Sequence, residues 1–479
     1  MNSGNSLPVG IIGAGPIGLA AAAHLAMRNQ PFIMFEAGNT IAANVLSWKH
    51  IKVFSPWKYN IDKAARQLLA GENWQSPPDE KLPTGEELYT LYFKPLAELP
   101  SIKPNLHIES RVLSIGRKNL DKMKTKGRNE LPFVIQVLRH SEITSYEVKA
   151  VIDASGTWNS PNPIGASGIY AEGEIENRSK IFYGIPDILN QHRDRYKNKS
   201  VVVAGSGHSA INAILELDKL KEIYPETEIH WILRKKNIRD IYGGQEKDAL
   251  EARGVLGIKI EQLVMQDRVN VYTPFQVQRM ENNDGKLIII GNQDDEKFAL
   301  NGIDEIISNT GSRPDFSFLR EVRLNIDPAL ESTAELADRI DPNIHSCGTV
   351  RPHGEKELRH PDKDFYIVGS KSYGRAPTFL MATGYEQVRS IAAAIDGDIE
   401  SALKVELDLP ETGVCRTDLD SDGCCSTKIE RTSISAPSPS SCCTPNNNNA
   451  VCCSPSQSVE ENNGACCAQP EDGSACCNK

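Results

Sequence analysis

The sequence lacks an excess of basic residues, a long uninterrupted apolar segment and any cysteine before Cys347. The 53 Lys and Arg residues against 63 Asp and Glu residues give a formal net charge of −10, so nucleic acid is not expected as a partner. The longest apolar stretch, residues 7–27, is interrupted by glycines and prolines and follows six residues without Lys or Arg. We therefore expect neither a signal peptide nor a membrane span, and a cytoplasmic protein without a membrane partner.

Cysteine is concentrated at the carboxyl-terminal end of the chain. Ten of the twelve cysteines form five adjacent pairs between residues 424 and 477, and the rest of the chain holds only Cys347 and Cys415. A secreted disulfide scaffold distributes its cysteines through the folded part. That class of protein is therefore excluded.

Residues 7–38 predict a strand, a tight turn, a helix and a second strand. The turn contains the pattern G-x-G-x-x-G, formed by Gly13, Gly15, Pro16, Ile17 and Gly18. The first glycine of such a turn permits the bend, the second lets a pyrophosphate approach the backbone, and the third allows close packing of helix on strand. Glu36 ends the next strand, where a carboxylate suits the free hydroxyls of a ribose. The segment predicts a site for FAD or NAD.

A second unit of the same form begins near residue 200. Its turn has the pattern G-x-G-x-x-A, formed by Gly205, Gly207, His208, Ser209 and Ala210. The strand that follows ends in Arg234, Lys235 and Lys236 instead of an acid. Cations at this point suit a ribose 2′-phosphate, which a carboxylate would repel. This unit predicts a site for NADPH rather than NADH, with a solvated basic turn as the alternative.

Three further segments, residues 149–161, 303–315 and 363–395, each begin as an apolar strand and continue into a small, polar turn. The turn residues of interest are Asp153, Gly156, Asn309, Gly311 and Gly369. Each segment alone is also consistent with an ordinary strand-to-loop transition. It is the order of the three segments around the two glycine-rich turns, and not any one segment, that indicates the organisation of the chain.

The combined pattern resembles the flavoproteins with two dinucleotide-binding domains, especially flavin-containing and N-hydroxylating monooxygenases, over about residues 7–400. The resemblance implies that the first turn, with Glu36, binds FAD and that the second, with Arg234, binds NADPH. We expect an α/β fold with two Rossmann-like domains and a disordered tail. The expected boundaries are 1–165 and 306–405 for the two parts of the FAD domain, 166–305 for the NADPH domain and 406–479 for the tail.

Residues 48–62, WKHIKVFSPWKYNID, resemble the flavin-side loop of the same family. Trp48 and Trp57 are expected to flank the isoalloxazine ring, and Asn60 is an amide that could hydrogen-bond to oxygen bound at the flavin. A packed aromatic loop is the alternative. His345, Cys347 and His353 are further candidates for substrate contact, with a structural loop as the alternative.

Some family patterns are absent. The sequence F-x-G-x-x-x-H-x-x-x-Y/W should precede the second turn, but residues 171–181, AEGEIENRSKI, lack the Phe, the His and the aromatic residue. The subclass of monooxygenase is therefore open. The C-x-x-x-x-C and C-x-x-C signatures of dithiol reductases are also missing from the two domains, so dithiol catalysis there is not expected.

The tail is rich in Ser, Pro, Asn, Gly, Asp and Glu, a composition typical of disorder. Its cysteines occur as adjacent pairs. The pairs are Cys424 and Cys425, Cys442 and Cys443, Cys452 and Cys453, Cys466 and Cys467, and Cys476 and Cys477. Consecutive Cα atoms lie about 3.8 Å apart, whereas the Cα atoms of a relaxed disulfide lie roughly 4.4–6.8 Å apart. The two cysteines of a pair are therefore not expected to form a disulfide with each other. Soft thiolates favour thiophilic centres, and zinc sites usually space cysteines by about two to four residues and often add His, which the tail lacks. Adjacent thiolates suit a pyramidal centre such as trivalent arsenic.

Vicinal cysteine pairs of this kind resemble those of arsenic metallochaperones, and the whole chain resembles the flavin monooxygenases of arsenic resistance. The resemblance implies an enzyme that uses NADPH and O₂ to oxidise trivalent arsenicals to pentavalent forms, with the tail collecting the substrate. For the tail, the alternatives are binding of other soft metals and an inert or redox-buffering segment. For the whole chain, they are an N-hydroxylating or sulfur-oxidising monooxygenase with an incidental tail, and a metalloid-sequestering protein.

Overall fold

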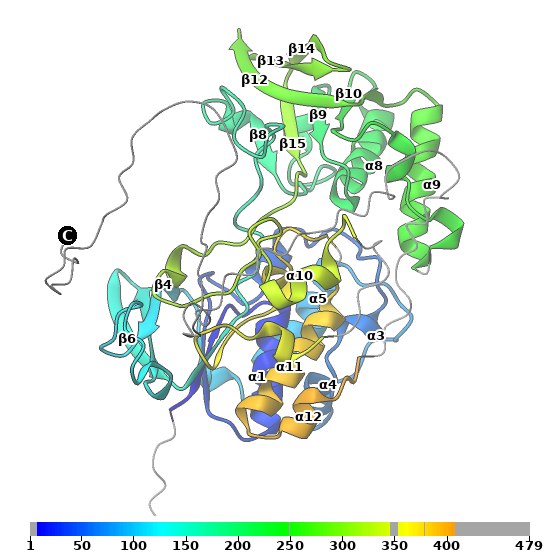
Figure 1. The fold of residues 1–479 in the computed structure, drawn as a ribbon. Coiled ribbons are helices and arrows are strands. Elements are labelled where there is room, and N and C mark those ends of the chain that lie inside the picture. The colour runs from blue at the N-terminus through cyan, green and yellow to red at the C-terminus, as the bar shows by residue number, and fades with distance from the viewer. Residues whose placement is uncertain (1–6, 249, 345–352, 378, 408–479) are drawn as a thin grey trace, which may run out of the picture. The chain divides into compact units, whose positions relative to one another are not determined.

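The computed structural model describes residues 7–248, 250–344, 353–377 and 379–407 (Figure 1). The five tail cysteine pairs, His345 and Cys347 lie outside the described residues. Within the described part of the chain, no helix is both long and apolar enough to cross a membrane.

The first glycine-rich turn belongs to a five-stranded parallel sheet with the order β16-β7-β1-β2-β3. Its strands are β1 (Val9–Ile12), β2 (Phe32–Phe35), β3 (Leu106–His107), β7 (Ala150–Asp153) and β16 (Phe365–Ile367). Strands β1, β7 and β16 are buried along their whole length. Such short, continuous apolar runs are typical of parallel strands that are covered on both faces.

Helices cover one face of this sheet, where α1 and α11 lie side by side (Figure 1). The longer helices here are α1 (Pro16–Met27), α4 (Lys63–Ala70) and α11 (Met381–Ile395). The shorter ones are α2 (Ala43–Leu46), α3 (Trp57–Asn60), α5 (Gly85–Leu88), α6 (Lys94–Ala97), α10 (Ala334–Ile340) and α12 (Ile399–Leu403). Helix α1 begins with Pro16, whose fixed φ suits a first helical position, and its alanine-rich middle is fully buried.

A three-stranded antiparallel sheet covers the other face. It consists of β4 (Arg111–Arg117), β5 (Phe133–Arg139) and β6 (Glu142–Val148). Ile115, Phe133 and Ile135 of this sheet share a hydrophobic cluster with Ile12 and Val151 of the parallel sheet.

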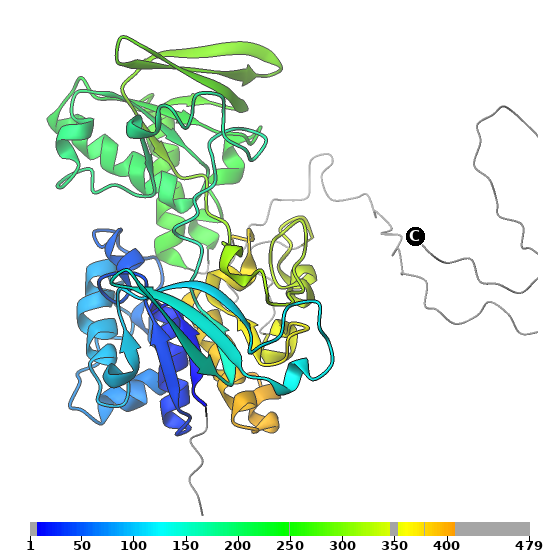
Figure 2. The ribbon, with the colours of Figure 1, turned by 90° about the vertical axis from the view of Figure 1, so that its left-hand side faces the viewer.

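The second glycine-rich turn belongs to another five-stranded parallel sheet, with the order β11-β10-β9-β15-β8. Its strands are β8 (Ile181–Tyr183), β9 (Ser200–Ala204), β10 (Glu228–Ile232), β11 (Asn270–Tyr272) and β15 (Glu305–Ser308). The helices of this domain are α7 (Arg193–Tyr196), α8 (His208–Ile223) and α9 (Glu251–Met265). A second antiparallel sheet, visible in Figure 2, consists of β12 (Phe275–Asn283), β13 (Lys286–Gln293) and β14 (Glu296–Ile303).

The first sheet is built from two separated parts of the chain. Strand β16 pairs with β7, although the whole second sheet lies between them in the sequence. The second sheet spans residues 181–308, and β15 runs three residues past the expected boundary at 305. The predicted α/β fold with two Rossmann-like domains is confirmed.

Candidate active site

Both glycine-rich turns lie where the strand order of their sheet reverses. Gly13 follows β1, has φ +94°, and a Cβ placed on it would lie 2.9 Å from the carbonyl oxygen of Ala154 at the end of β7. Gly205 follows β9, has φ +135°, and its Cβ would lie 2.3 Å from the carbonyl oxygen of Asn309 after β15. Such switch points at the carboxyl ends of parallel strands are where these sheets bind ligands.

The third position of each turn packs the helix against its strand. A Cβ on Gly18 would lie 1.9 Å from the carbonyl oxygen of Gly13, so only glycine fits there. In the second turn Ala210 stands at this position and is fully buried. Gly18 and Ala210 therefore allow each helix to pack closely against its strand, the role expected for the third position of such a turn.

The middle glycines leave space for a ligand. A Cβ on Gly15 or on Gly207 would have no neighbour within 4 Å among the described residues. Each is the N-cap of a helix, α1 or α8, and neither helix start receives a side-chain cap. Helix N-termini with free N–H groups are ready-made sites for phosphate, so both cradles fit a pyrophosphate.

Glu36 ties the first turn to the end of β2. Its carboxylate accepts the N–H of Ala14 at 2.7 Å and the N–H of Gly38 at 2.8 Å. The side chain lines the cavity described next. It stands beside the pyrophosphate cradle, where a ribose would lie.

A cavity of about 830 Å³ opens in front of the first turn, within the size range of ligand sites. It brings together many of the residues expected to bind cofactors: Gly13, Gly15, Pro16, Ile17, Glu36, Trp48, Gly156, His208, Ser209 and Gly369. His208 and Ser209 come from the first turn of α8, so the helix of the second glycine turn supplies part of the wall.

Phe54 connects the flavin-side loop to the second domain. Its ring lies 5.2 Å from the ring of His208 and 5.9 Å from the guanidinium of Arg253. Arg253 is held in turn by Asp248 at 2.7 Å. Burial and the neighbouring Arg253 lower the pKa of His208, so its imidazole is neutral at pH 7. Nothing in the spacing of the sequence indicated the contact between Phe54 and His208.

Trp57 and Asn60 do not reach the cavity. Trp57 is fully buried in the core of the first domain. The Asn60 amide donates to the carbonyl oxygens of Ser55 and Pro56 at 2.7 and 2.9 Å, and its oxygen accepts the Ser55 hydroxyl at 2.9 Å. Asn60 therefore shapes the loop that presents Ser55 to the cavity, in place of the flavin contact expected from the sequence.

Asp153 is also occupied within the protein. Its carboxylate accepts the ammonium of Lys371 at 2.7 Å and the hydroxyl of Ser155 at 2.6 Å, and both charged side chains are fully buried. The ammonium lies 4.4 Å from the ring centre of Phe318. This pair ties the end of β7 to the turn after β16, and it fixes Ser155 in the cavity wall. Lys371 was missed because its partner is 218 residues away in sequence.

The residues around the second turn lie at the carboxyl edge of the second sheet. Arg234 and Lys235 follow β10 and are exposed, and the Arg234 guanidinium lies 3.4 Å from the carbonyl oxygen of Ala166. Asn309 donates its amide to the carbonyl oxygen of Gly184 at 2.8 Å, and Gly311 has φ +83°. None of these four residues lines the large cavity.

His353 packs behind Gly369. Its Nε2 lies 2.8 Å from the amide nitrogen of Gln387, whose oxygen accepts the N–H of Gly369. His353 is buried and supports the turn after β16, which corresponds to the structural alternative considered for it.

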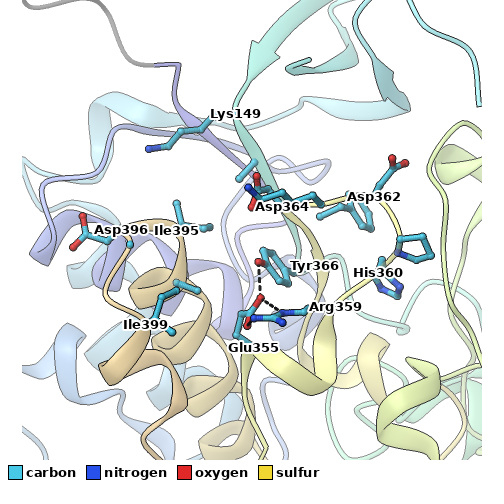
Figure 3. A pocket seen from close by; sticks show the side chains of 16 residues that line it. Lys149, Glu355, Arg359, His360, Asp362, Asp364, Tyr366, Ile395, Asp396 and Ile399 are labelled. Carbon is cyan, nitrogen blue, oxygen red and sulfur yellow. Dashed lines mark hydrogen bonds and ion pairs between the residues drawn. The ribbon is translucent and has the colours of Figure 1, made fainter. Parts of the chain in front are cut away.

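Another cavity, of about 660 Å³, lies at the opposite edge of the first sheet, where β7 and β16 begin (Figure 3). The hydroxyl of Tyr366 and the guanidinium of Arg359 both donate to Glu355, at 2.9 and 2.7 Å. Ligands of parallel α/β sheets bind at the carboxyl ends of the strands, and this cavity lies at the opposite end, away from both glycine-rich turns.

Residues 10–348 match the family model described as pyridine nucleotide-disulphide oxidoreductase. A ferredoxin–NADP reductase from Ehrlichia ruminantium is 27% identical over 145 residues, which cover 30% of this chain and 35% of that protein. The match thus spans about a third of the length of this curated relative.

Solved structures share the fold at low identity. The bacillithiol disulfide reductase from Bacillus cereus is 18% identical with a TM-score of 0.61, covering 82% of this chain and 99% of that one. The ornithine N-hydroxylase from Kutzneria sp. 744 is 15% identical with a TM-score of 0.51, covering 83% of this chain and 98% of that one. Both reductases and N-hydroxylating monooxygenases are thus built on this fold.

Proposed function

The chain belongs to the pyridine nucleotide-disulphide oxidoreductase family, and from this premise we propose that it is an NADPH-dependent flavin monooxygenase that oxidises trivalent arsenicals. It is a flavin-dependent oxidoreductase whose cofactors are FAD and NAD(P)H, and the preference for NADPH over NADH belongs to the proposal. The choice of O₂ as electron acceptor and of arsenic as substrate belongs to the proposal.

FAD is assigned to the first site. The cradle at Gly15 and the N-terminus of α1 would hold its pyrophosphate, and Glu36 would bind the ribose. NADPH is assigned to the second site, with the cradle at Gly207 and with Arg234 and Lys235 at the 2′-phosphate. When bound, FAD accepts a hydride from NADPH and supplies electrons to O₂.

The observation that carries the proposal is the shared wall of the large cavity. Gly15 from the first turn and His208 from the helix of the second turn line the same space. This arrangement supports electron transfer between the two cofactors. Phe54 and Trp48 add apolar surface to the wall, which helps to exclude water from the reacting centre.

In the proposal the electrons go to an acceptor other than a dithiol within the two dinucleotide-binding domains. No cysteine occurs in residues 1–346, so neither described dinucleotide site has a cysteine pair from its own sequence. In the proposed reaction, one atom of O₂ is added to trivalent arsenic and the other leaves as water. NADPH and one proton supply the two electrons and the hydrogen atoms that this balance requires.

The tail provides the test of substrate identity. Truncation after residue 407 should leave folding, FAD content and turnover at saturating trivalent arsenical unchanged. The apparent affinity should fall by about tenfold or more, because tethered dithiols raise the local substrate concentration. Binding should also lose several equivalents, and replacing cysteine pairs one at a time by serines should give graded losses.

NADPH oxidation and arsenical binding are measured on full-length and truncated protein, with ornithine and a thioether as competing substrates. Stimulation of NADPH oxidation by the amine or the thioether, and none by the arsenical, would replace the arsenic assignment with an N-hydroxylating or sulfur-oxidising one. Binding without any oxidation would identify a sequestering protein.

Arg234→Ala should weaken the binding of NADPH roughly 10- to 100-fold and that of NADH little, because a charge-assisted hydrogen bond to phosphate contributes about 1.5–3 kcal/mol. Lys297→Ala serves as the control, since Lys297 is an exposed cation of the same domain on strand β14. Dissociation constants from flavin-reduction kinetics check the result. Equal losses for both nucleotides would remove the proposed 2′-phosphate contact.

A further inference from the structure

A pair of titratable side chains joins the flavin-side loop to the helix of the second site, behind the wall of the large cavity. His50 lies in the loop between Trp48 and Ile51, both of which line the cavity. Glu216 lies on α8, one helical turn after Asn212, which lines the cavity from the other domain.

The two side chains face each other without a completed hydrogen bond. The Nε2 atom of His50 and the Oε2 atom of Glu216 are 4.0 Å apart, and the side chains are only 12% and 17% exposed. Neither atom is accessible to solvent, and neither has a hydrogen-bond partner among the described residues. A buried polar atom without a partner is costly, so a proton shared between these two atoms would stabilise the contact.

The surroundings favour one proton for the pair. Burial lowers the pKa of His50, and the positive charges of His192 and Lys49 lower it further. Asp187 and the carbonyl of Pro186 act in the opposite direction and raise it. Burial raises the pKa of Glu216 to about 7, with Asp187 adding to the rise and the Ile188 amide and Lys219 opposing it. The pair therefore holds a proton in the acidic range and loses it as the pH rises above neutrality.

We propose that His50 and Glu216 form a proton-dependent latch that positions the flavin-side loop against helix α8 for hydride transfer. The inference rests on the proposed function, because it assigns FAD to the loop side and NADPH to the side of α8. The pair acts through the loop and the helix, since neither His50 nor Glu216 lines the cavity itself.

Whether the contact between His50 and Glu216 closes depends on whether a proton lies between the imidazole nitrogen and the carboxylate oxygen. With one proton present, either a neutral Glu216 donates to His50 or a charged His50 donates to the Glu216 carboxylate, and the contact closes. Without this proton, the lone pair of the imidazole nitrogen faces a carboxylate oxygen in a buried space. Because the two atoms then repel each other, the flavin-side loop and helix α8 separate. The latch is closed at acidic pH and opens as the pH rises through neutrality.

The test uses the full-length protein loaded with FAD, and it measures anaerobic reduction of the flavin by NADPH as a function of pH. The wild-type rate should fall about tenfold from pH ~6 to pH ~9, the size of effect expected for losing one hydrogen bond to a charged group. Glu216→Gln should remove the fall, because its amide donates to neutral His50 at every pH. His50→Gln should do the same, because its amide donates to the ionised Glu216.

The control is Glu222→Gln, an exposed carboxylate further along α8, which should keep the wild-type profile. A purely structural role would change stability equally at all pH values and leave the shape of the profile intact. A wild-type decline that persists in both glutamine variants overturns the latch.

Amide hydrogen exchange in residues 48–56 provides a readout that is independent of hydride transfer. Above neutral pH the loop should exchange faster in the wild type than in Glu216→Gln at the same pH, and below it the two should match. If this difference is found while NADPH fails to reduce the flavin at any pH, the proposed function is wrong and the latch stands. Equal exchange throughout overturns the latch.

Discussion

Gly15→Val is expected to give a folded protein that has lost its flavin. The backbone at Gly15 has φ −77° and ψ −173°, which any residue adopts, and a Cβ there meets no described atom within 4 Å. The added side chain therefore costs little in the empty cradle but occupies the space that the pyrophosphate needs. Flavin absorbance of the purified protein and FAD released on denaturation measure the loss.

Gly207→Val is the matched control. It stands at the same position of the second turn, with φ −89°, ψ 174° and open space beside it. This variant should remain yellow but should no longer be reduced by NADPH. If Gly207→Val instead lost its FAD and Gly15→Val kept FAD but was not reduced by NADPH, the assignment of the two cofactors would be reversed. Full FAD retention by Gly15→Val would show that the first cradle is not the flavin site. Gly13 and Gly18 are unsuitable for this test, because a Cβ at either collides with backbone.

Lys371→Met is expected to destabilise the protein by about 3–5 kcal/mol, because removing one partner of a buried ion pair leaves an uncompensated charge. The remaining carboxylate of Asp153 would be fully buried, and among the described residues Ser155 would be its one side-chain donor. Urea denaturation followed by fluorescence checks the free energy of unfolding, and flavin absorbance reports the effect on the cavity wall.

The double variant Lys371→Met with Asp153→Asn should recover a large part of that loss, because no buried charge remains. The difference between the double variant and the sum of the single variants gives the coupling between the two side chains. A loss below about 1 kcal/mol in Lys371→Met would show that the pair contributes no more than an exposed ion pair does.

The positions that the sequence predicted well are those where the backbone alone sets the requirement. Gly13, Gly18 and Gly205 are required by contacts with carbonyl oxygens at the ends of strands, and the spacing of the glycines along the chain reflects those contacts directly. The parallel strands at the centre of both sheets belong to the same strand–turn–helix units. The fold class and the presence of two dinucleotide sites were predictable for this reason.

The positions that the sequence missed depend on side chains far apart in the chain. Asn60 is taken up by its own loop, and Asp153 by Lys371, so residue types that suit a ligand contact serve the protein instead. The contacts of Phe54 with His208 and of His50 with Glu216 join the two domains. Periodicity and spacing carry no signal for such pairs.

The split first sheet has a consequence for how the chain folds during synthesis. All five strands of the second sheet lie within residues 181–308, so this domain can fold as soon as that segment leaves the ribosome. The first sheet cannot be completed until β16 at residues 365–367 emerges to pair with β7. Because domains fold as units and pairings distant in sequence form slowly, we expect the second domain to mature before the first, although β1, β2, β3 and β7 of the first domain precede it in the chain.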